Sequence, residues 1–223
     1  MVEIKNIKVY DLEESVIACR NAMRTEMPEY TKEEFDKSFE RAKKLCVASR
    51  DDEHVKCHDN FLTGIRVSFD IKYPQYFTPE LQRYHWIDIV TSASKMHKLM
   101  FRPVDEACNK YVSRESVEQL QKYIDRYNRI LNDRDFKGEV FILRNGERII
   151  DTDKNDALYH ARIIALSNCP LGYELFMRVS TNYKQLQTIY WQRINHRLQE
   201  DWGAFCEFIR SLPYSKEFIT VDA

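Results

Sequence analysis

Strict alternation of apolar and polar side chains marks the clearest element of the chain, a strand over residues 65–71. Polar residues lie between its apolar positions, which are Ile65, Val67, Phe69 and Ile71. Because successive side chains of a strand point to opposite faces, this pattern predicts a sheet with one buried and one polar face. Shorter apolar stretches predict two further strands, over residues 4–10 and 175–180.

A second strand signal comes from the short stretch over residues 139–150. Residues 139–143 and 148–150 are apolar enough to form strands, and they flank the dipeptide Asn145-Gly146. Asn-Gly favours the tight turn that joins two antiparallel strands. We therefore expect a β-hairpin in this part of the chain.

Helix starts are indicated by capping residues. Thr31 and Glu34 form a capping box ahead of a helix to about residue 48, and Ser113 caps a helix over residues 114–132. Thr78, Pro79 and Glu80 are typical of a helix start, and we expect that helix to pass Arg83. Two more helices are predicted over residues 12–23, with Met23 facing inward, and 156–166.

The last predicted helix is long, running to about residue 211, and it carries a polar stripe. Asn182 and Arg193 are eleven residues apart, about three turns of a helix, and Glu200 falls on the same line. Leu186 and Ile189 lie among them, so this face should enter a core. A buried arginine needs an anionic partner, which could be Glu200 or a ligand phosphate.

The same spacing separates Arg83 from Ser94. If the helix that starts near residue 78 persists, both side chains share one of its faces. The simpler interpretation is a surface arginine in a helix that the following serines end. The β-branched run over residues 87–91 makes the far end of this helix uncertain.

Strands and helices mix along the chain without a repeat or a linker rich in Pro, Gly or Ser. This organisation predicts one α+β domain spanning residues 1–223. Only five glycines occur and no two are close, which excludes the familiar glycine-rich phosphate cradles.

Charge excludes some partners. The chain has 34 Lys and Arg against 35 Asp and Glu, a formal net charge of −1. This balance argues against bulk attraction to nucleic acid or to a membrane, so an anion site must be local. No apolar run is long enough to span a bilayer and residues 1–10 lack the apolar stretch of a secretory signal, so we expect a cytoplasmic protein with reduced cysteines.

A metal site is not expected. His54, Cys57 and His58 could be ligands, but the sequence offers no fourth ligand at a zinc-like spacing.

Three blocks of the sequence, taken together, resemble the flavin-dependent thymidylate synthases. The segment Cys57-His58-Asp59-Asn60 before the strand at residues 65–71 is similar to the family's Gly-His-x-Thr segment. The segment from Arg83 to Ser94 occupies the place of the family's signature Arg-His-Arg-x-x-Ser-x-Asn-Glu-x-Ser-x-Arg. Asn182, Lys184, Leu186 and Arg193 resemble its Asn-x-Arg-x-Leu block and downstream arginine.

The chain departs from the signature at several positions. Tyr84 and His85 follow Arg83 where the family has His and Arg. Ala93 stands at the place of the signature serine, with Ser92 and Ser94 on either side. Arg162 is the nearest match to a further family arginine that holds the nucleotide phosphate, and it lies one helical turn early.

The resemblance implies a central, mostly antiparallel sheet with long flanking helices. It further implies that a pyrimidine deoxynucleotide, dUMP, is methylated to dTMP by an enzyme with bound flavin (FAD), using a reduced folate as methylene donor and NADPH as reductant. The family is homotetrameric and shares its flavin sites between subunits. Its arginines polarise the uracil and hold the phosphate.

Carried over residue by residue, the resemblance assigns candidate roles. The catalytic candidates are Ser94 and Arg193. The nucleotide-binding candidates are Arg83, Ser92, Ser94, Arg162 and Arg193. The flavin-binding candidates are His58, Asn60, Tyr84, His85, Asn182, Lys184 and Thr188.

Two other hypotheses stay open. One is a protein on the same scaffold that binds a nucleotide or a flavin without turnover, as the altered signature suggests. The other is a structural protein whose buried arginines form only ion pairs, as Arg193 and Glu200 would.

Overall fold

The computed structural model describes residues 1–51 and 58–221. Contacts group the chain into two compact units. Unit 1 comprises Met1–Tyr73, Phe77–Ser92 and Phe176–Ala223, and unit 2 comprises Pro74–Tyr76 and Ala93–Leu175. The architecture is α+β with antiparallel strand pairing, as expected. The prediction of one domain over residues 1–223 stays a prediction.

Unit 1 is built on a four-stranded sheet of order β1-β2-β6-β3. Its strands are β1 (Glu3–Tyr10), β2 (Arg66–Pro74), β3 (Asp88–Ser92) and β6 (Glu174–Asn182). The β1–β2 and β3–β6 pairs are antiparallel. The alternation of β2 is confirmed, because its apolar side chains are buried while the polar ones between them keep partial exposure.

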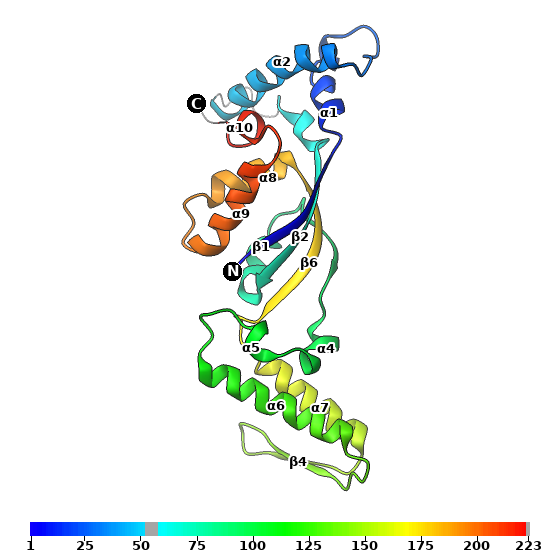
Figure 1. The fold of residues 1–223 in the computed structure, drawn as a ribbon, viewed down its shortest axis with the longest axis vertical. Helices are drawn as coiled ribbons and strands as arrows, with labels where there is room; N and C mark the ends of the chain where they lie inside the picture. The colour runs from blue at the N-terminus through cyan, green and yellow to red at the C-terminus, as the bar shows by residue number, and fades with distance from the viewer. Residues whose placement is uncertain (52–57, 222–223) are drawn as a thin grey trace. The chain divides into compact units, whose positions relative to one another are not determined.

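Helices cover one side of this sheet (Figure 1). The helices of unit 1 are α1 (Leu12–Ala18), α2 (Lys32–Asp51), α3 (Thr78–Leu81), α8 (Tyr183–Arg193), α9 (Gln199–Ser211) and α10 (Ser215–Phe218), with short 3-10 turns η1 (Asn21–Met23) and η3 (Asn60–Thr63). The buried Phe69 of β2 packs its ring against Phe205 and Phe208 of α9. This contact places α9, and with it the end of α8, against the sheet.

Unit 2 is a helical pair with a hairpin. Its elements are η4 (Gln75–Phe77), α4 (Lys95–Lys98), η5 (Leu99–Phe101), α5 (Val104–Ala107), α6 (Arg114–Asn132), β4 (Glu139–Ile142), β5 (Arg148–Asp151) and α7 (Lys154–Ser167). Helices α6 and α7 pack together around a core that includes Leu120, Ile124 and Phe141. The Ser113 cap is confirmed, because its side chain accepts a hydrogen bond from the backbone of Ser116.

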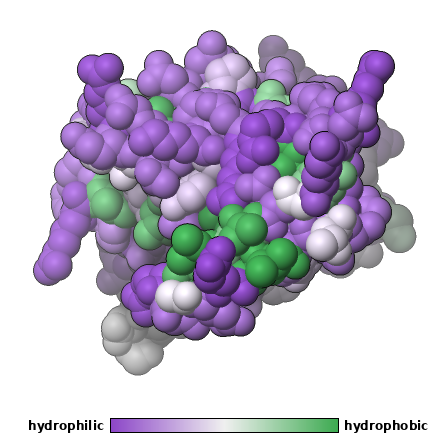
Figure 2. Space-filling view, turned by 90° about the horizontal axis from the view of Figure 1, so that it is seen from below, coloured by the Kyte–Doolittle hydropathy of each residue, from purple (hydrophilic) through white to green (hydrophobic). Residues whose placement is uncertain are grey.

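The predicted hairpin is confirmed as β4 and β5, which pair in register around a turn at Gly146 with φ of 85°. Phe141 lies on the inner face and is buried. The outer face exposes Val140, Ile142 and Ile150. Figure 2 shows this face from below, with a patch of hydrophobic residues among hydrophilic ones.

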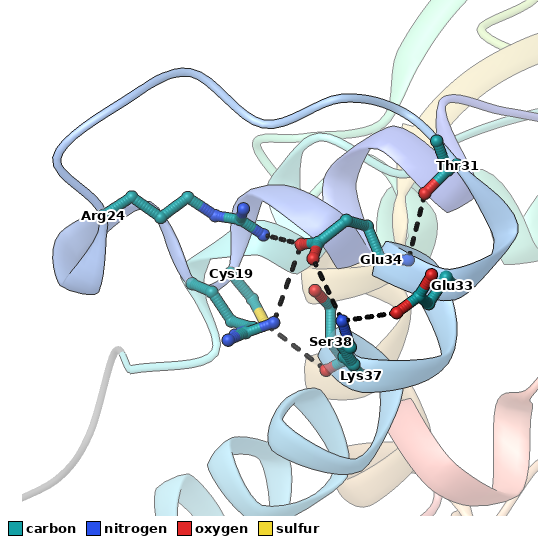
Figure 3. Close-up of polar contacts among 8 residues, drawn as sticks. Cys19, Arg24, Thr31, Glu33, Glu34, Lys37 and Ser38 are labelled. Carbon is teal, nitrogen blue, oxygen red and sulfur yellow. Dashed lines mark hydrogen bonds and ion pairs between the residues drawn. The ribbon is translucent and has the colours of Figure 1, made fainter.

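An ion pair and hydrogen bonds hold the connection from α1 to α2 (Figure 3). Thr31 Oγ1 accepts the backbone N–H of Glu34 at 3.2 Å, which confirms Thr31 as the cap of α2. The second bond of the predicted capping box is not formed, because the backbone N–H of Thr31 donates to the carbonyl of Glu29. Glu34 itself pairs with Arg24 at 2.6 Å. The Cys19 thiol donates to the carbonyl of Ser38, and burial raises its pKa to about 11.

Three predicted helix extents are wrong. Helix α1 ends at Ala18, and Met23, expected to face inward, is 82% exposed. The helix that starts at Thr78 ends at Leu81, because the β-branched residues that follow pair with β6 as strand β3. Arg83 and Ser94 therefore do not share a helical face.

The terminal helix is also broken. Helix α8 ends at Arg193 and α9 begins at Gln199. In the turn between them, His196 Nδ1 accepts the backbone N–H of Leu198 at 3.2 Å, a local bond that competes with a helical one. The redirected α9 buries Trp202 and Phe205 completely. Asn182 and Arg193 consequently do not line up with Glu200.

Candidate functional site

Arg193 is the centre of one polar cluster in unit 1. It is the last residue of α8, and its side chain is 12% exposed. The guanidinium carbon lies 4.6 Å from the ring centroid of Trp202 and 5.4 Å from that of Tyr84. A guanidinium stacked on aromatic rings is stabilised by their π faces.

The anionic partner of Arg193 is Glu80 rather than Glu200. Glu80 belongs to α3, and its Oε2 lies 2.8 Å from Nη1 of Arg193. The expected Arg193–Glu200 pair is therefore corrected: the turn after α8 carries Glu200 into a different helix. In the sequence, Glu80 is recognisable only as an acid in the first turn of a predicted helix, and no local pattern links it to Arg193.

Tyr84 fixes the orientation of this arginine. Its hydroxyl accepts a hydrogen bond from Nε of Arg193 at 2.6 Å and donates to Oε1 of Gln192 at 3.1 Å. Tyr84 is 8% exposed, and burial raises the pKa of its phenol although the hydrogen bond from Arg193 acts in the opposite direction. The phenol therefore stays protonated and can keep both bonds.

A second cation–carboxylate cluster lies at the start of α8. Asn182 caps the helix by accepting the backbone N–H of Gln185 at 2.9 Å. Nζ of Lys184 donates to both carboxylate oxygens of Asp59, each at 2.7 Å. Asp59 is completely buried, whereas Lys184 keeps 30% exposure. Asp59 was not singled out from the sequence, although it lies within the block that resembles Gly-His-x-Thr.

The segment between α3 and β3 is held by buried side chains of β6 and α8. Thr181 Oγ1 donates to the carbonyl of Trp86 at 2.7 Å, and Gln185 Oε1 accepts the backbone N–H of Trp86 at 3.4 Å. Arg83 and His85, on either side of the buried Tyr84, are exposed. Arg83 and His85 therefore face solvent from a segment whose backbone is held at Trp86 by Thr181 and Gln185.

The two candidate serines flank the start of unit 2. Ser92 is exposed at the end of β3. Ser94 precedes α4, and its Oγ lies 2.9 Å from Nδ1 of His97. Ser94 belongs to unit 2 and Arg193 to unit 1.

Arg162 lies in α7 of unit 2. Its Nη2 donates to the hydroxyl of Tyr127 at 2.6 Å, and its guanidinium lies 5.3 Å from the centroid of that ring. Nε of Arg162 is buried and has no hydrogen-bond partner within residues 1–51 and 58–221. Its assignment to the nucleotide phosphate stays a prediction.

The remaining flavin-binding candidates are exposed. His58 and Asn60 lie at the start of η3, and Thr188 lies on α8, where its hydroxyl donates to the carbonyl of Lys184 at 3.2 Å. In the part of the chain that the structure describes, no group of three His, Cys, Asp or Glu side chains could hold a metal ion. His54 and Cys57, two of the ligands weighed from the sequence, lie outside the described residues. No helix among the described residues is long and apolar enough to cross a membrane.

Comparisons with known proteins identify the fold. No protein-family model matches the chain, and no curated protein matches its sequence. Solved structures do match over nearly the whole length. The flavin-dependent thymidylate synthase ThyX from Helicobacter pylori, crystallised with FAD and dUMP, has 15% identity and a TM-score of 0.60, over 98% of this chain and 96% of that one.

A second similar structure is the UMP/dUMP methylase PolB from Streptomyces cacaoi, bound with 5-Br dUMP. It has 14% identity and a TM-score of 0.55, over 99% of this chain and 94% of that one. The chain therefore has the fold of the flavin-dependent thymidylate synthases, as the resemblance of its three sequence blocks predicted.

Proposed function

We propose that this chain is a divergent flavin-dependent thymidylate synthase-like enzyme that methylates a pyrimidine deoxynucleotide, dUMP to dTMP. The observation that carries the proposal is the match of fold along almost the entire chain to proteins crystallised with FAD and dUMP or with 5-Br dUMP. Fold alone does not determine chemistry, so the site residues must supply the rest.

Arg193 is the residue best prepared for a nucleotide. Its guanidinium lies over the ring of Trp202, and its Nε donates to the hydroxyl of Tyr84, which leaves further N–H groups for an anion. A planar guanidinium pairs two oxygens at once and stays charged when it is buried. We assign it to the nucleotide, together with Arg83, Ser92, Ser94 and Arg162, and we assign Ser94 and Arg193 to catalysis.

The fit to a flavin depends on exposed side chains. The exposed candidates are His58, Asn60, His85 and Thr188, of which Thr188 donates its hydroxyl to the carbonyl of Lys184. The other candidates are engaged: Tyr84 by Arg193, Asn182 by the start of α8, and Lys184 by Asp59. When bound, the flavin would supply the transfer of the methylene group and of hydride, with a reduced folate and NADPH as co-substrates. A homotetramer with flavin sites shared between subunits belongs to the same proposal.

The alternative is a protein that binds a nucleotide or a flavin on this scaffold without turnover. The departures from the family's signature motivate it: Tyr84 and His85 follow Arg83, and Ala93 stands at the place of the signature serine.

The test begins with the visible absorption spectrum of the protein after gel filtration with excess FAD, followed by titration with dUMP. We expect a co-eluting flavin band and saturable dUMP binding. Absence of flavin would refute the enzyme and leave the nucleotide-binding alternative to the dUMP titration.

The role of Arg193 is tested by Arg193→Ala and Arg193→Lys. Arg210→Ala is a matched control, because Arg210 also donates to a tyrosine, Tyr190, and pairs with a glutamate, Glu207, within unit 1. We expect both Arg193 variants to lose dUMP binding and the control to retain it. If Arg193→Ala lowers stability but leaves binding intact, Arg193 is a structural ion-pair residue only.

A further inference from the structure

Two atoms beside Arg193 lack hydrogen-bond partners. Oε2 of Glu80 is buried, and although it lies 2.8 Å from Nη1 of Arg193, the contact does not have the direction of a hydrogen bond. Nε1 of Trp202 is buried and has no acceptor among the described residues. A buried polar atom without a hydrogen bond is costly, so this arrangement is not the best that the same groups could make.

The guanidinium of Arg193 has more N–H donors than it uses with the described residues. Within residues 1–51 and 58–221, the polar contacts of its side chain are Tyr84, through Nε, and Glu80, through Nη1. A guanidinium carries five N–H donors in a planar fork that matches two oxygens of a phosphate. A phosphate could therefore form the directed hydrogen bonds that the Glu80 carboxylate does not.

Glu80 is the more exposed side chain of the pair, although its Oε2 is buried. Its side chain is 31% exposed, whereas that of Arg193 is 12% exposed. His196 lies nearby, with Nε2 at 3.9 Å from the same carboxylate oxygen. Exchange requires the Glu80 carboxylate to turn away from Arg193, whose guanidinium is still held by the hydrogen bond to Tyr84 and by the ring of Trp202.

We propose that Glu80 is an internal anion that occupies Arg193 in the ligand-free chain and is exchanged for the nucleotide phosphate on binding. The inference rests on the proposed function, since it takes Arg193 as the residue that receives the nucleotide. Glu80 thereby sets the affinity: the ligand must compete with a carboxylate that is already present, and removing that charge strengthens binding.

The experiment compares Glu80→Gln with the parent protein by calorimetric titration with dUMP and, separately, with inorganic phosphate. Glu207→Gln is the matched control, because Glu207 pairs with Arg210 in the same unit. We expect Glu80→Gln to tighten dUMP binding by about fivefold, the factor that corresponds to the upper range for a partly exposed ion pair. Glu207→Gln should leave the affinity unchanged.

A local readout identifies where the anion binds. Trp202 is fully buried, whereas Trp86 and Trp191 are exposed. In a protein carrying Trp86→Phe and Trp191→Phe, the remaining tryptophan fluorescence comes from Trp202, the indole beside Arg193. Anion binding should change it, and Arg193→Ala should remove that response. Glu80→Asp, which keeps the charge on a shorter side chain, should tighten binding less than Glu80→Gln.

Unchanged or weaker binding in Glu80→Gln would overturn the inference, and weaker binding would make Glu80 a residue that positions Arg193. Phosphate binding reported by Trp202 without any dUMP binding would refute the proposed function, while the phosphate affinities would still decide the role of Glu80. If neither ligand binds the parent protein or Glu80→Gln, both proposals fail.

Discussion

Unit 1 contains two cation–carboxylate pairs at opposite ends of the same helix, and they are built in opposite ways. At the start of α8, the carboxylate of Asp59 is completely buried and Lys184 keeps 30% exposure, with both oxygens 2.7 Å from Nζ. At its end, Arg193 is 12% exposed and Glu80 is 31% exposed, with one contact of 2.8 Å. The comparison suggests which pair is structural and which can be exchanged for a ligand.

Burial of the acid makes the difference. A fully buried carboxylate cannot recover water when its partner leaves, so the Lys184–Asp59 pair is expected to be permanent. A partly exposed carboxylate can be solvated again, and its ion pair contributes little to stability. On this argument, Lys184 is less available to the proposed flavin than Arg193 is to the proposed nucleotide.

The largest effect is expected from Lys184→Met, which keeps the length of the side chain but removes its charge. Asp59 would be left buried without a cation, and we expect a loss of about 3–5 kcal/mol in the free energy of unfolding. Urea denaturation measures it. Stability close to that of the parent protein would show that Asp59 is not held by Lys184 alone, and the contrast between the two pairs would disappear.

A smaller loss is expected from Tyr84→Phe. The variant keeps the ring under Arg193 but removes the acceptor of its Nε–H, a hydrogen bond of 2.6 Å to a charged group. We expect a loss of about 1.5–3 kcal/mol, the range for hydrogen bonds to charged groups. Thermal unfolding at fixed pH is the measurement, with Tyr190→Phe as a control for the corresponding bond to Arg210. Equal losses in both variants would mean that Arg193 is held no more firmly than Arg210.

Glu139 of unit 2 lies between the two extremes, with 11% exposure and two arginine partners, Arg126 and Arg129, at 2.6 and 2.8 Å. Burial alone would raise the pKa of its carboxyl, but the hydrogen bonds from the two arginines outweigh it and the pKa is lowered. A folded-state pKa below the unfolded value stabilises the fold above the unfolded pKa, near 4.3. That contribution is lost as the pH falls through the folded pKa.

The corresponding prediction is that Glu139→Gln removes part of the acid dependence of stability. Chemical denaturation at pH 7 should show a loss of about 1 kcal/mol, and the difference from the parent protein should shrink below pH 4. A difference that stays constant from pH 7 to pH 3 would contradict the assignment to this carboxylate.

The smallest effect on stability is expected from Glu80→Gln, at most about 1 kcal/mol, because Glu80 is partly exposed and the Tyr84 hydroxyl and the Trp202 ring still stabilise the charge of Arg193. Differential scanning fluorimetry without ligand would detect it. A loss as large as that of Lys184→Met would place Glu80 among the permanent partners and would argue against its exchange for a phosphate.

Much of the framework could be predicted from the sequence because its signals are local. The alternation over residues 65–71 identified β2 and its buried face, Thr31 and Ser113 identified the starts of α2 and α6, and Asn145-Gly146 identified the hairpin. The requirement that Arg193 have an anionic partner was also a sequence inference, since it follows from the cost of desolvating a charge.

Only the tertiary structure decided that this partner is Glu80. The spacing of Asn182, Arg193 and Glu200 places them on one face only if they belong to one straight helix. In the structure α8 ends at Arg193, and the separate helix α9 buries Trp202 and Phe205. In the same way, the helix that begins at Thr78 stays short because residues 88–92 pair with β6 as a strand. Arg83 then lies exposed beside the buried Tyr84. Helix ends and long-range ion pairs depend on contacts between residues far apart in the chain, and the spacing of neighbouring residues carries no information about them.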